Sequence, residues 1–336
     1  MEDDLMFGKM MNRYYYGKSG KGDYTKDDLP TNRWQLFWEM LRVRFAGLFK
    51  INLLYMLAWI PVIAIIIRAV TMVMSGLMNL SDLQLQLEAG EIAAEVYTEN
   101  QLMFFDALKV IALQTLGMLI PAIAITGPFT AGLAYVTRNW ARDEHSFMMS
   151  DYFEAVKNNW KQALLTSTIT GFVPMLLYVC AIFYGSMAND NMLFLVPQVL
   201  SITIGVVWLC SLMYMYPQMV TYNLKFSALV RNSLLMTIGR LPQTIGIKLI
   251  TLAPAAICAV VSLITPYMQY ALLILAAYYV VLGFSLSRFV QASYANAVFD
   301  RYINPNVEGA EVGRGLYVET DDEEEETESS DESANV

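Results

Sequence analysis

The chain has 336 residues, of which 56% are hydrophobic and only 16% are charged, with a mean hydropathy of +0.41. Soluble globular domains average roughly 45–50% apolar and about 25% charged residues, so this composition excludes that class. Twelve of the 31 acidic residues lie between Asn306 and Val336, so the net charge of -9 belongs to the C-terminus. The remaining chain is nearly neutral, which excludes a nucleic-acid binder built on a basic face.

The first segment, residues 1–33, is polar and contains no apolar run typical of a signal peptide. Aromatic and basic stretches follow at 34–50, 150–162 and 225–240, each directly ahead of an apolar run. Aromatic rings and long cationic side chains are typical of the membrane–water interface. Each stretch therefore predicts an interfacial amphipathic helix.

Six apolar stretches predict transmembrane helices, because about 20 mostly apolar residues are needed to cross roughly 30 Å of hydrocarbon. The longest stretch without charge, 249–287, contains Thr265-Pro266 near its middle, which favours two helices joined by a tight turn. The predicted spans are 48–74, 107–128, 163–186, 192–215, 243–264 and 267–288. The sequence thus predicts an all-α, polytopic fold with a six-helix membrane domain over 34–303.

Positive charge determines the predicted orientation of these spans. With six crossings, 19 of the 22 Lys and Arg residues fall on the side that carries both termini. The positive-inside rule assigns that side to the cytoplasm. The sequence therefore predicts a multi-pass membrane protein with both termini cytoplasmic.

Two connecting regions carry acidic residues. The external loop 75–106 has acids with apolar residues between them at helical spacing, which predicts a short amphipathic helix over the outer membrane face. A cap that binds a ligand or partner is the alternative. The tail 304–336 is acidic and poor in apolar residues, which predicts a disordered, solvated terminus, with a docking peptide for a basic partner as the alternative.

Residue types that carry catalysis or bind metals are scarce. Cys180, Cys210 and Cys258 all lie within apolar runs, where free thiols usually pack inertly, and His145 is the one histidine. Zinc sites and nucleophilic triads need histidine beside other reactive groups. We therefore expect no enzyme activity, no metal site and no cofactor.

Ionisable and helix-breaking residues inside spans are the first functional candidates. Arg68 and Lys248 are the ionisable residues in or at the edge of the predicted spans. Either their long side chains extend to the membrane surface, or they belong to a functional site. Gly127 and Pro128 predict either a packing bend or an unwound substrate site. Asn52 is a polar residue that can bridge two helices.

A short pattern occurs in two of the interfacial stretches. Phe153 to Asn159 and Phe226 to Asn232 both fit F-x-A-x-x-x-N and both precede an apolar run. Internal repeats of this general kind occur in transporters. Phe153 and Asn159 are therefore added to the candidates, and three parallel helix-plus-hairpin units are the corresponding hypothesis.

Several motifs occur in the order seen in one known family. They are Ile51-Asn52-Leu53-Leu54, the stretch from Ile125 to Leu133 with Thr126-Gly127-Pro128, and the helix from Asp151 to Gln162. Together they resemble the YesL-type family of polytopic bacterial membrane proteins, a domain of unknown function. The resemblance implies a membrane protein often found beside carbohydrate-uptake systems, and it supplies no catalytic residue. The chain departs from the compact family pattern in its long external loop and acidic tail.

Together with the apolar spans, this resemblance implies an integral protein of a bacterial cytoplasmic membrane, of unknown biochemical activity, that is an accessory or regulatory component of carbohydrate transport. Its expected partners are the lipid bilayer and transporter subunits at the cytoplasmic face, with no nucleic acid. The alternative is a stand-alone channel or facilitative transporter, which the broken spans and the possible repeat favour.

Overall fold

The computed structural model describes residues 29–317, in which the regular structure is helical and contains no strand. Six helical segments are long and apolar enough to cross a membrane. They are Arg33–Glu88, Ala94–Trp140, Met148–Ala188, Met192–Thr221, Leu241–Ile264 and Met268–Tyr302. The predicted all-α fold with six spans is confirmed in this part of the chain.

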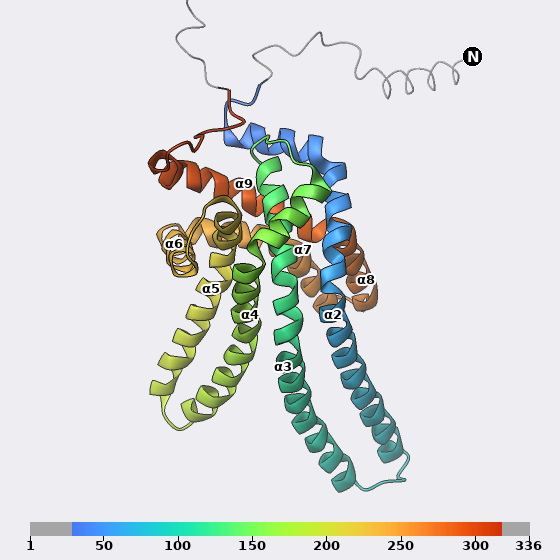
Figure 1. The fold of residues 1–336 in the computed structure, drawn as a ribbon. Coiled ribbons are helices and arrows are strands. Elements are labelled where there is room, and N and C mark those ends of the chain that lie inside the picture. Colours follow the sequence, from blue (N-terminus) through green and yellow to red (C-terminus); the bar gives the residue numbers. More distant parts are fainter. Residues whose placement is uncertain (1–28, 318–336) are drawn as a thin grey trace, which may run out of the picture.

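The six segments are built from named elements shown in Figure 1. The first three are α2 (Arg33–Glu88), α3 (Ala94–Trp140) and α4 (Met148–Ala188). The 3₁₀ turn η2 (Met192–Phe194) leads into α5 (Leu195–Thr221), and the shorter helix α6 (Phe226–Gly239) precedes α7 (Leu241–Ile264). The last segment joins α8 (Met268–Tyr278), the π-helical turn η3 (Tyr279–Gly283) and α9 (Phe284–Tyr302), and the 3₁₀ turn η4 (Asn304–Asn306) follows.

The helices converge at one end of the molecule. We call the end at which α3, α5 and α9 finish the packed end, and the opposite end, with the turns at 89–93 and 189–191, the hairpin end. Both limits of the described chain lie at the packed end, and the α2–α3 hairpin extends furthest from it (Figure 1).

Most of the expected external loop 75–106 is helical. Helix α2 continues to Glu88 and α3 begins at Ala94, so only 89–93 lies outside the helices. The two helices remain paired near their tips, because a Cβ added at Gly76 would lie 2.3 Å from Cε2 of Phe104. The acids spaced between apolar residues thus belong to the ends of two long helices rather than to a separate short helix, and the external position of this segment stays a prediction.

Two of the three expected interfacial helices are also not separate elements. Stretches 34–50 and 150–162 are the first turns of α2 and α4, whereas 225–240 corresponds to the separate helix α6. No glycine or proline interrupts the chain between 150 and 162, so the helix continues into the span without a break. The predicted spans lie within the six segments, apart from Tyr267, which immediately precedes α8.

The predicted N-terminal segment 1–33 and tail 304–336 fall largely outside the described residues. The described part of the tail is not free in solution: the backbone N–H of Tyr317 donates to the carbonyl of Pro30 at 2.9 Å. The N–H of Gly313 donates to the Asp300 carboxylate at 3.2 Å. The expected disorder is therefore wrong for 304–317, because polar groups of the helix ends hold this segment.

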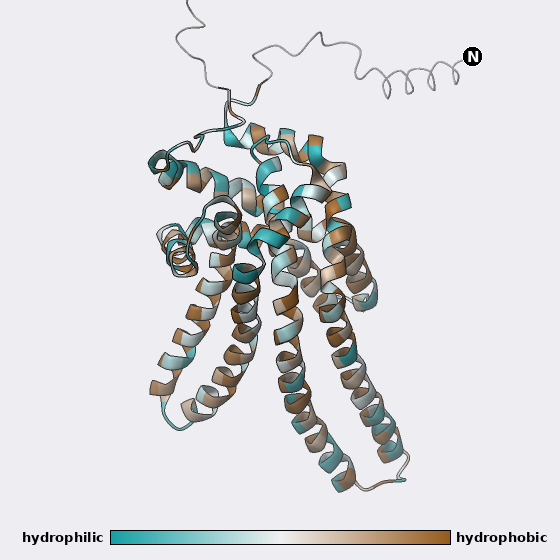
Figure 2. Cartoon of the chain, viewed as in Figure 1, coloured by the Kyte–Doolittle hydropathy of each residue, from teal (hydrophilic) through white to brown (hydrophobic). Residues whose placement is uncertain are grey.

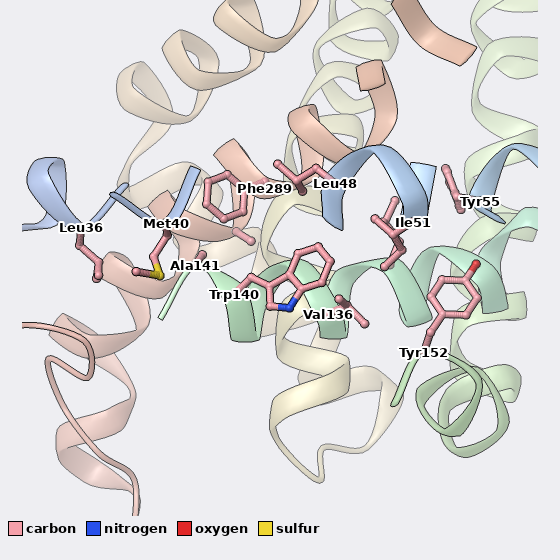
Figure 3. Close-up of a cluster of buried hydrophobic side chains, with 12 residues drawn as sticks. Leu36, Met40, Leu48, Ile51, Tyr55, Val136, Trp140, Ala141, Tyr152 and Phe289 are labelled. Atoms are coloured by element: carbon pink, nitrogen blue, oxygen red, sulfur yellow. The ribbon is translucent and has the colours of Figure 1, made fainter. Parts of the chain in front are cut away.

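The main apolar core lies at the packed end and is formed by α2, α3, α4 and α9. Its buried members include Leu48, Trp140, Tyr152 and Phe289, and Figure 3 shows these side chains between the helices. Helix α2 approaches α3 closely here, because a Cβ added at Gly47 would lie 2.8 Å from Cη2 of Trp140. This core holds the ends of the long helices together.

The apolar middle of each span is mostly uncovered by the rest of the protein. Only 6% to 22% of the residues in the most apolar window of each segment are buried within the molecule. Figure 2 shows hydrophobic residues along both hairpins and hydrophilic residues gathered toward the packed end. Uncovered apolar helices of this length fit contact with a lipid bilayer.

Candidate functional site

A cavity lies at the packed end, beside the first turns of α4. We call it the α4–α5 cavity. Its volume is about 630 Å³, and it lies between α4, the end of α5 and the connection to α6. Its lining residues are Tyr135, Asp151, Glu154, Ala155, Asn158, Asn159, Trp160, Lys161, Gln162, Met219, Val220, Thr221, Tyr222, Asn223 and Leu224. Gln162 connects two of its walls by donating to the carbonyl of Leu224 at 2.9 Å.

Several polar side chains of this cavity are not used by the fold. Asp151 is engaged, because its carboxylate accepts from the Ser146 hydroxyl and the Phe147 N–H, both at 2.9 Å, and so caps the start of α4. Glu154 forms no ion pair or hydrogen bond within residues 29–317. The ammonium of Lys161 lies 5.6 Å from the ring centroid of Trp160. The wall therefore presents both signs of charge and an aromatic face to a partner.

A second cavity of about 320 Å³ adjoins the first, and Thr221 and Tyr222 line both. One of its lining residues is Glu144, which lies in the connection after α3. Three arginines surround it, at 3.0 Å (Arg138), 3.2 Å (Arg142) and 3.7 Å (Arg314). We call these four residues the Glu144 cluster. One carboxylate thus holds three guanidinium groups together.

The Glu144 cluster connects α3 to the C-terminal segment. Arg142 is buried and donates to the carbonyl of Glu311 at 2.8 Å. Burial lowers the pKa of Arg142, and the neighbouring Arg138 acts in the same direction while Glu144 opposes it. The guanidinium group of arginine keeps its charge in proteins. The cluster is therefore a charged contact rather than a neutral one.

Further polar contacts complete the packed end. The Tyr222 hydroxyl donates to the side-chain oxygen of Asn304 at 2.5 Å, and burial raises the pKa of this tyrosine. Arg33, at the start of α2, pairs with Asp300 near the end of α9. The beginnings and ends of the described helices are thus joined by side chains around the two cavities.

Residues 102–180 match the family model described as "Protein of unknown function, DUF624". No curated protein and no solved structure matches the chain. The DUF624 segment covers most of α3 and the greater part of α4, including the α4 wall of the α4–α5 cavity. The match supports the expected domain of unknown function, and the YesL-type resemblance stays a prediction.

The DUF624 segment contains four of the predicted candidates. Helix α3 runs without a break through Gly127 and Pro128, so the alternative of an unwound substrate site there is wrong. A Cβ at Gly127 would lie 2.0 Å from the Ser167 hydroxyl oxygen, which shows that this glycine permits close packing of α3 on α4. Asn159 lines the α4–α5 cavity, whereas Phe153 is exposed and does not line it.

The other candidates lie apart from the two cavities. Asn52 is fully buried and bonds to the backbone of η3 and α9. Arg68 is exposed on α2 and contacts the sulfur of Met118 at 3.5 Å. Lys248 lies on α7, and its side chain forms no ion pair or hydrogen bond with another described residue. The structure therefore does not bring the predicted candidates into one site.

Sequence analysis missed Glu144, Arg142 and Tyr222. All three lie at or just beyond a helix end, where charged and aromatic residues are common in membrane proteins. One signal was present: Glu144 lies among Arg138, Arg142 and Asp143, a dense group of charges between two apolar runs. Within residues 29–317, no group of three or more His, Cys, Asp or Glu side chains is placed to hold a metal ion.

Proposed function

We propose that this protein is an accessory or regulatory membrane protein that acts by binding a partner rather than by catalysis. In this proposal it crosses a bacterial cytoplasmic membrane, and the packed end, which carries most Lys and Arg, faces the cytoplasm. The partner is a subunit of a carbohydrate transporter. The carbohydrate assignment rests on the YesL-type resemblance alone.

The observation that carries the binding proposal is the α4–α5 cavity. Its volume is about 630 Å³, and it lies at the packed end, where a soluble or peripheral partner can reach it. Glu154 and Asn158 line it without a hydrogen bond to another described residue, so they are available to a partner. Polar side chains with unused hydrogen-bonding capacity at the rim are typical of protein interfaces.

The distribution of buried polar groups weighs against the stand-alone channel. A conducting path needs polar or charged groups along its length. Among residues 29–317, no polar side chain that is buried as a whole lies within 63–121, 172–204 or 252–284, the parts of the spans toward the hairpin end, although the hydroxyl oxygens of Thr115 and Ser262 are buried there. A path through one copy of the chain would therefore find few buried polar groups in this part of the spans.

A photo-crosslinking experiment tests the binding proposal. A photoreactive phenylalanine analogue replaces Asn158 in the full chain, and the protein is irradiated in native membranes before the captured proteins are identified. The expected result is enrichment of a transporter subunit. The same analogue at Leu176, which is exposed on the same helix toward the hairpin end, is the matched control.

Two further measurements decide between the proposals. Glu154→Gln should weaken capture at Asn158, because it removes a charge from the cavity wall. Capture of the same proteins from both positions, or no transporter subunit from Asn158, contradicts the accessory role. Flux of a sugar or an ion into liposomes that contain only this chain would favour the channel instead.

A further inference from the structure

Lys248 occupies a defined place between α5 and α7. The hydroxyls of Tyr214 and Thr244 lie 2.8 Å apart, and they fix the register of these two helices, which run in opposite directions. One helical turn further toward the hairpin end, α5 presents Cys210 and α7 presents Lys248. Because residues four apart share a helix face, Lys248 lies beside Cys210 and is directed toward α5.

Arg288 lies on the neighbouring helix α9 and is also directed toward α5. Its guanidinium carbon lies 5.2 Å from the ring centroid of Tyr216. Gln291, one turn further along α9, donates to the Thr251 hydroxyl of α7 at 3.4 Å, which holds α7 and α9 together. Lys248 lies about one turn from Thr251 on α7, and Arg288 lies about one turn from Gln291 on α9, so both cations lie beside this contact between the two helices.

Neither cation has an acidic partner. The ion pairs among residues 29–317 involve Arg33, Lys109 and the arginines of the Glu144 cluster. The acid on α9, Asp300, is about three turns from Arg288 and pairs with Arg33. Two partly buried cations without a counter-charge repel each other, so an anion that binds both is favoured.

A third group beside the cations has an unused acceptor. Gln291 is 7% exposed, and its side-chain oxygen is buried without a hydrogen bond. Because a buried acceptor without a partner is costly, a ligand that donates a hydroxyl here would be stabilised. Lys248 lies about 10 Å along α7 from Leu241, a depth at which the headgroup region of a bilayer is within reach of a long side chain.

We propose that Lys248 and Arg288 bind the phosphate of a hydroxyl-bearing anionic ligand, with Gln291 accepting the hydroxyl. The oxygens on opposite sides of one phosphate accept hydrogen bonds from the ammonium and the guanidinium. The phosphate belongs either to a lipid headgroup or to a free phosphate. This site is separate from the α4–α5 cavity and does not depend on the proposed partner.

Binding of defined probes to the purified full chain tests the site. Inorganic phosphate, phosphatidylglycerol and phosphatidylcholine are each titrated in detergent, and bound species are counted by native mass spectrometry. We expect inorganic phosphate or phosphatidylglycerol to bind more tightly than phosphatidylcholine. Lys248→Met and Arg288→Gln should each weaken this binding about tenfold or more, because each removes a charged hydrogen bond.

Two variants keep the result interpretable. Lys248→Arg retains the charge and should retain binding, even if Lys248→Met folds poorly. Arg68→Gln removes an exposed cation elsewhere in a span and should leave binding unchanged. Binding of phosphatidylglycerol alone assigns a lipid headgroup, and binding of inorganic phosphate assigns a free phosphate. The site is overturned if neither probe binds, or if Arg68→Gln weakens binding as much as Lys248→Met.

Discussion

The side-chain oxygen of Asn52 accepts a hydrogen bond from the backbone N–H of Ser285 at 2.9 Å. The amide nitrogen of the same side chain donates to the carbonyls of Tyr279 and Val280, both at 2.8 Å. Tyr279 and Val280 are the first two residues of the π-helical turn η3, where regular α-helical hydrogen bonding is interrupted, and Ser285 follows just after it. An amide carries both donors and an acceptor, so Asn52 satisfies all three groups inside an apolar span.

Replacing Asn52 by leucine should therefore destabilise the protein substantially. The change leaves three backbone groups without partners in the core, and we expect a loss of about 2–4 kcal/mol. Thermal unfolding in mild detergent, followed by tryptophan fluorescence, measures the effect. The matched control is Asn100→Ala, which removes an exposed hydrogen bond within α3 and should change stability by less than about 0.5 kcal/mol. Equal shifts for the two variants would contradict the bridging role.

Gly127→Ala should separate α3 from α4. The new methyl carbon would lie 2.3 Å from the backbone carbonyl oxygen of Ala163, which cannot move aside as a side chain can. We expect a loss of about 2 kcal/mol or more, because overpacking forces the backbone to shift.

Gly117→Ala is the control on the same helix, because nothing lies within 4 Å of the added carbon. Alanine also favours the helix over glycine by about 0.5–1 kcal/mol, so this variant should be neutral or more stable. The melting temperatures of both variants in the same detergent decide the question. An unchanged melting temperature for Gly127→Ala would contradict the close packing of α3 on α4.

The span count was predictable because it depends on stretches of apolar residues, which are local in the sequence. The role of Asn52 was predictable only as a bridge between helices, because its partner η3 lies more than 220 residues further along the chain. The length of the α2–α3 hairpin was not predicted, since acids such as Glu95 suggested a loop outside the membrane. Helix formation tolerates these acids when the apolar residues between them pack on a neighbouring helix.

The polar packed end was not predictable from local patterns either. Glu144 is close in the sequence to Arg138 and Arg142, with which it pairs. Arg314, which also pairs with Glu144, lies far away in the sequence, after the last membrane span. Sequence alone shows these residues as separate charges at helix ends. Their meeting depends on how α3 and α9 are packed, which only the tertiary structure determines.

Glu144→Gln should destabilise the packed end. The change leaves Arg138 and Arg142, which are 12% and 5% exposed, without their carboxylate, and we expect a loss of about 2–4 kcal/mol. Glu311→Gln is the control, because that carboxylate is 62% exposed and its pair with Arg314 should contribute at most about 1 kcal/mol. Thermal unfolding of both variants at low and high salt is the measurement. A Glu311→Gln loss as large as that of Glu144→Gln would contradict the central role of Glu144.

The docking of the C-terminal segment depends on Gly315. This glycine has a φ of +82°, and a Cβ added to it would lie 2.9 Å from the carbonyl oxygen of Arg142. Gly309 has a similar φ of +75°, but nothing lies within 4 Å of its added carbon. The two alanine variants therefore share the backbone strain, about 1 kcal/mol, and differ in the clash with Arg142.

We expect Gly315→Ala to release the segment more than Gly309→Ala does. Cleavage after Glu311 by a glutamate-specific protease reports the open population, and the bond cut is the same in both variants. An additional loss of about 1.4 kcal/mol would make cleavage of Gly315→Ala about tenfold faster than that of Gly309→Ala. If both variants are cleaved at the same rate, strain alone explains the change, and the contact between Gly315 and Arg142 does not hold the segment in place.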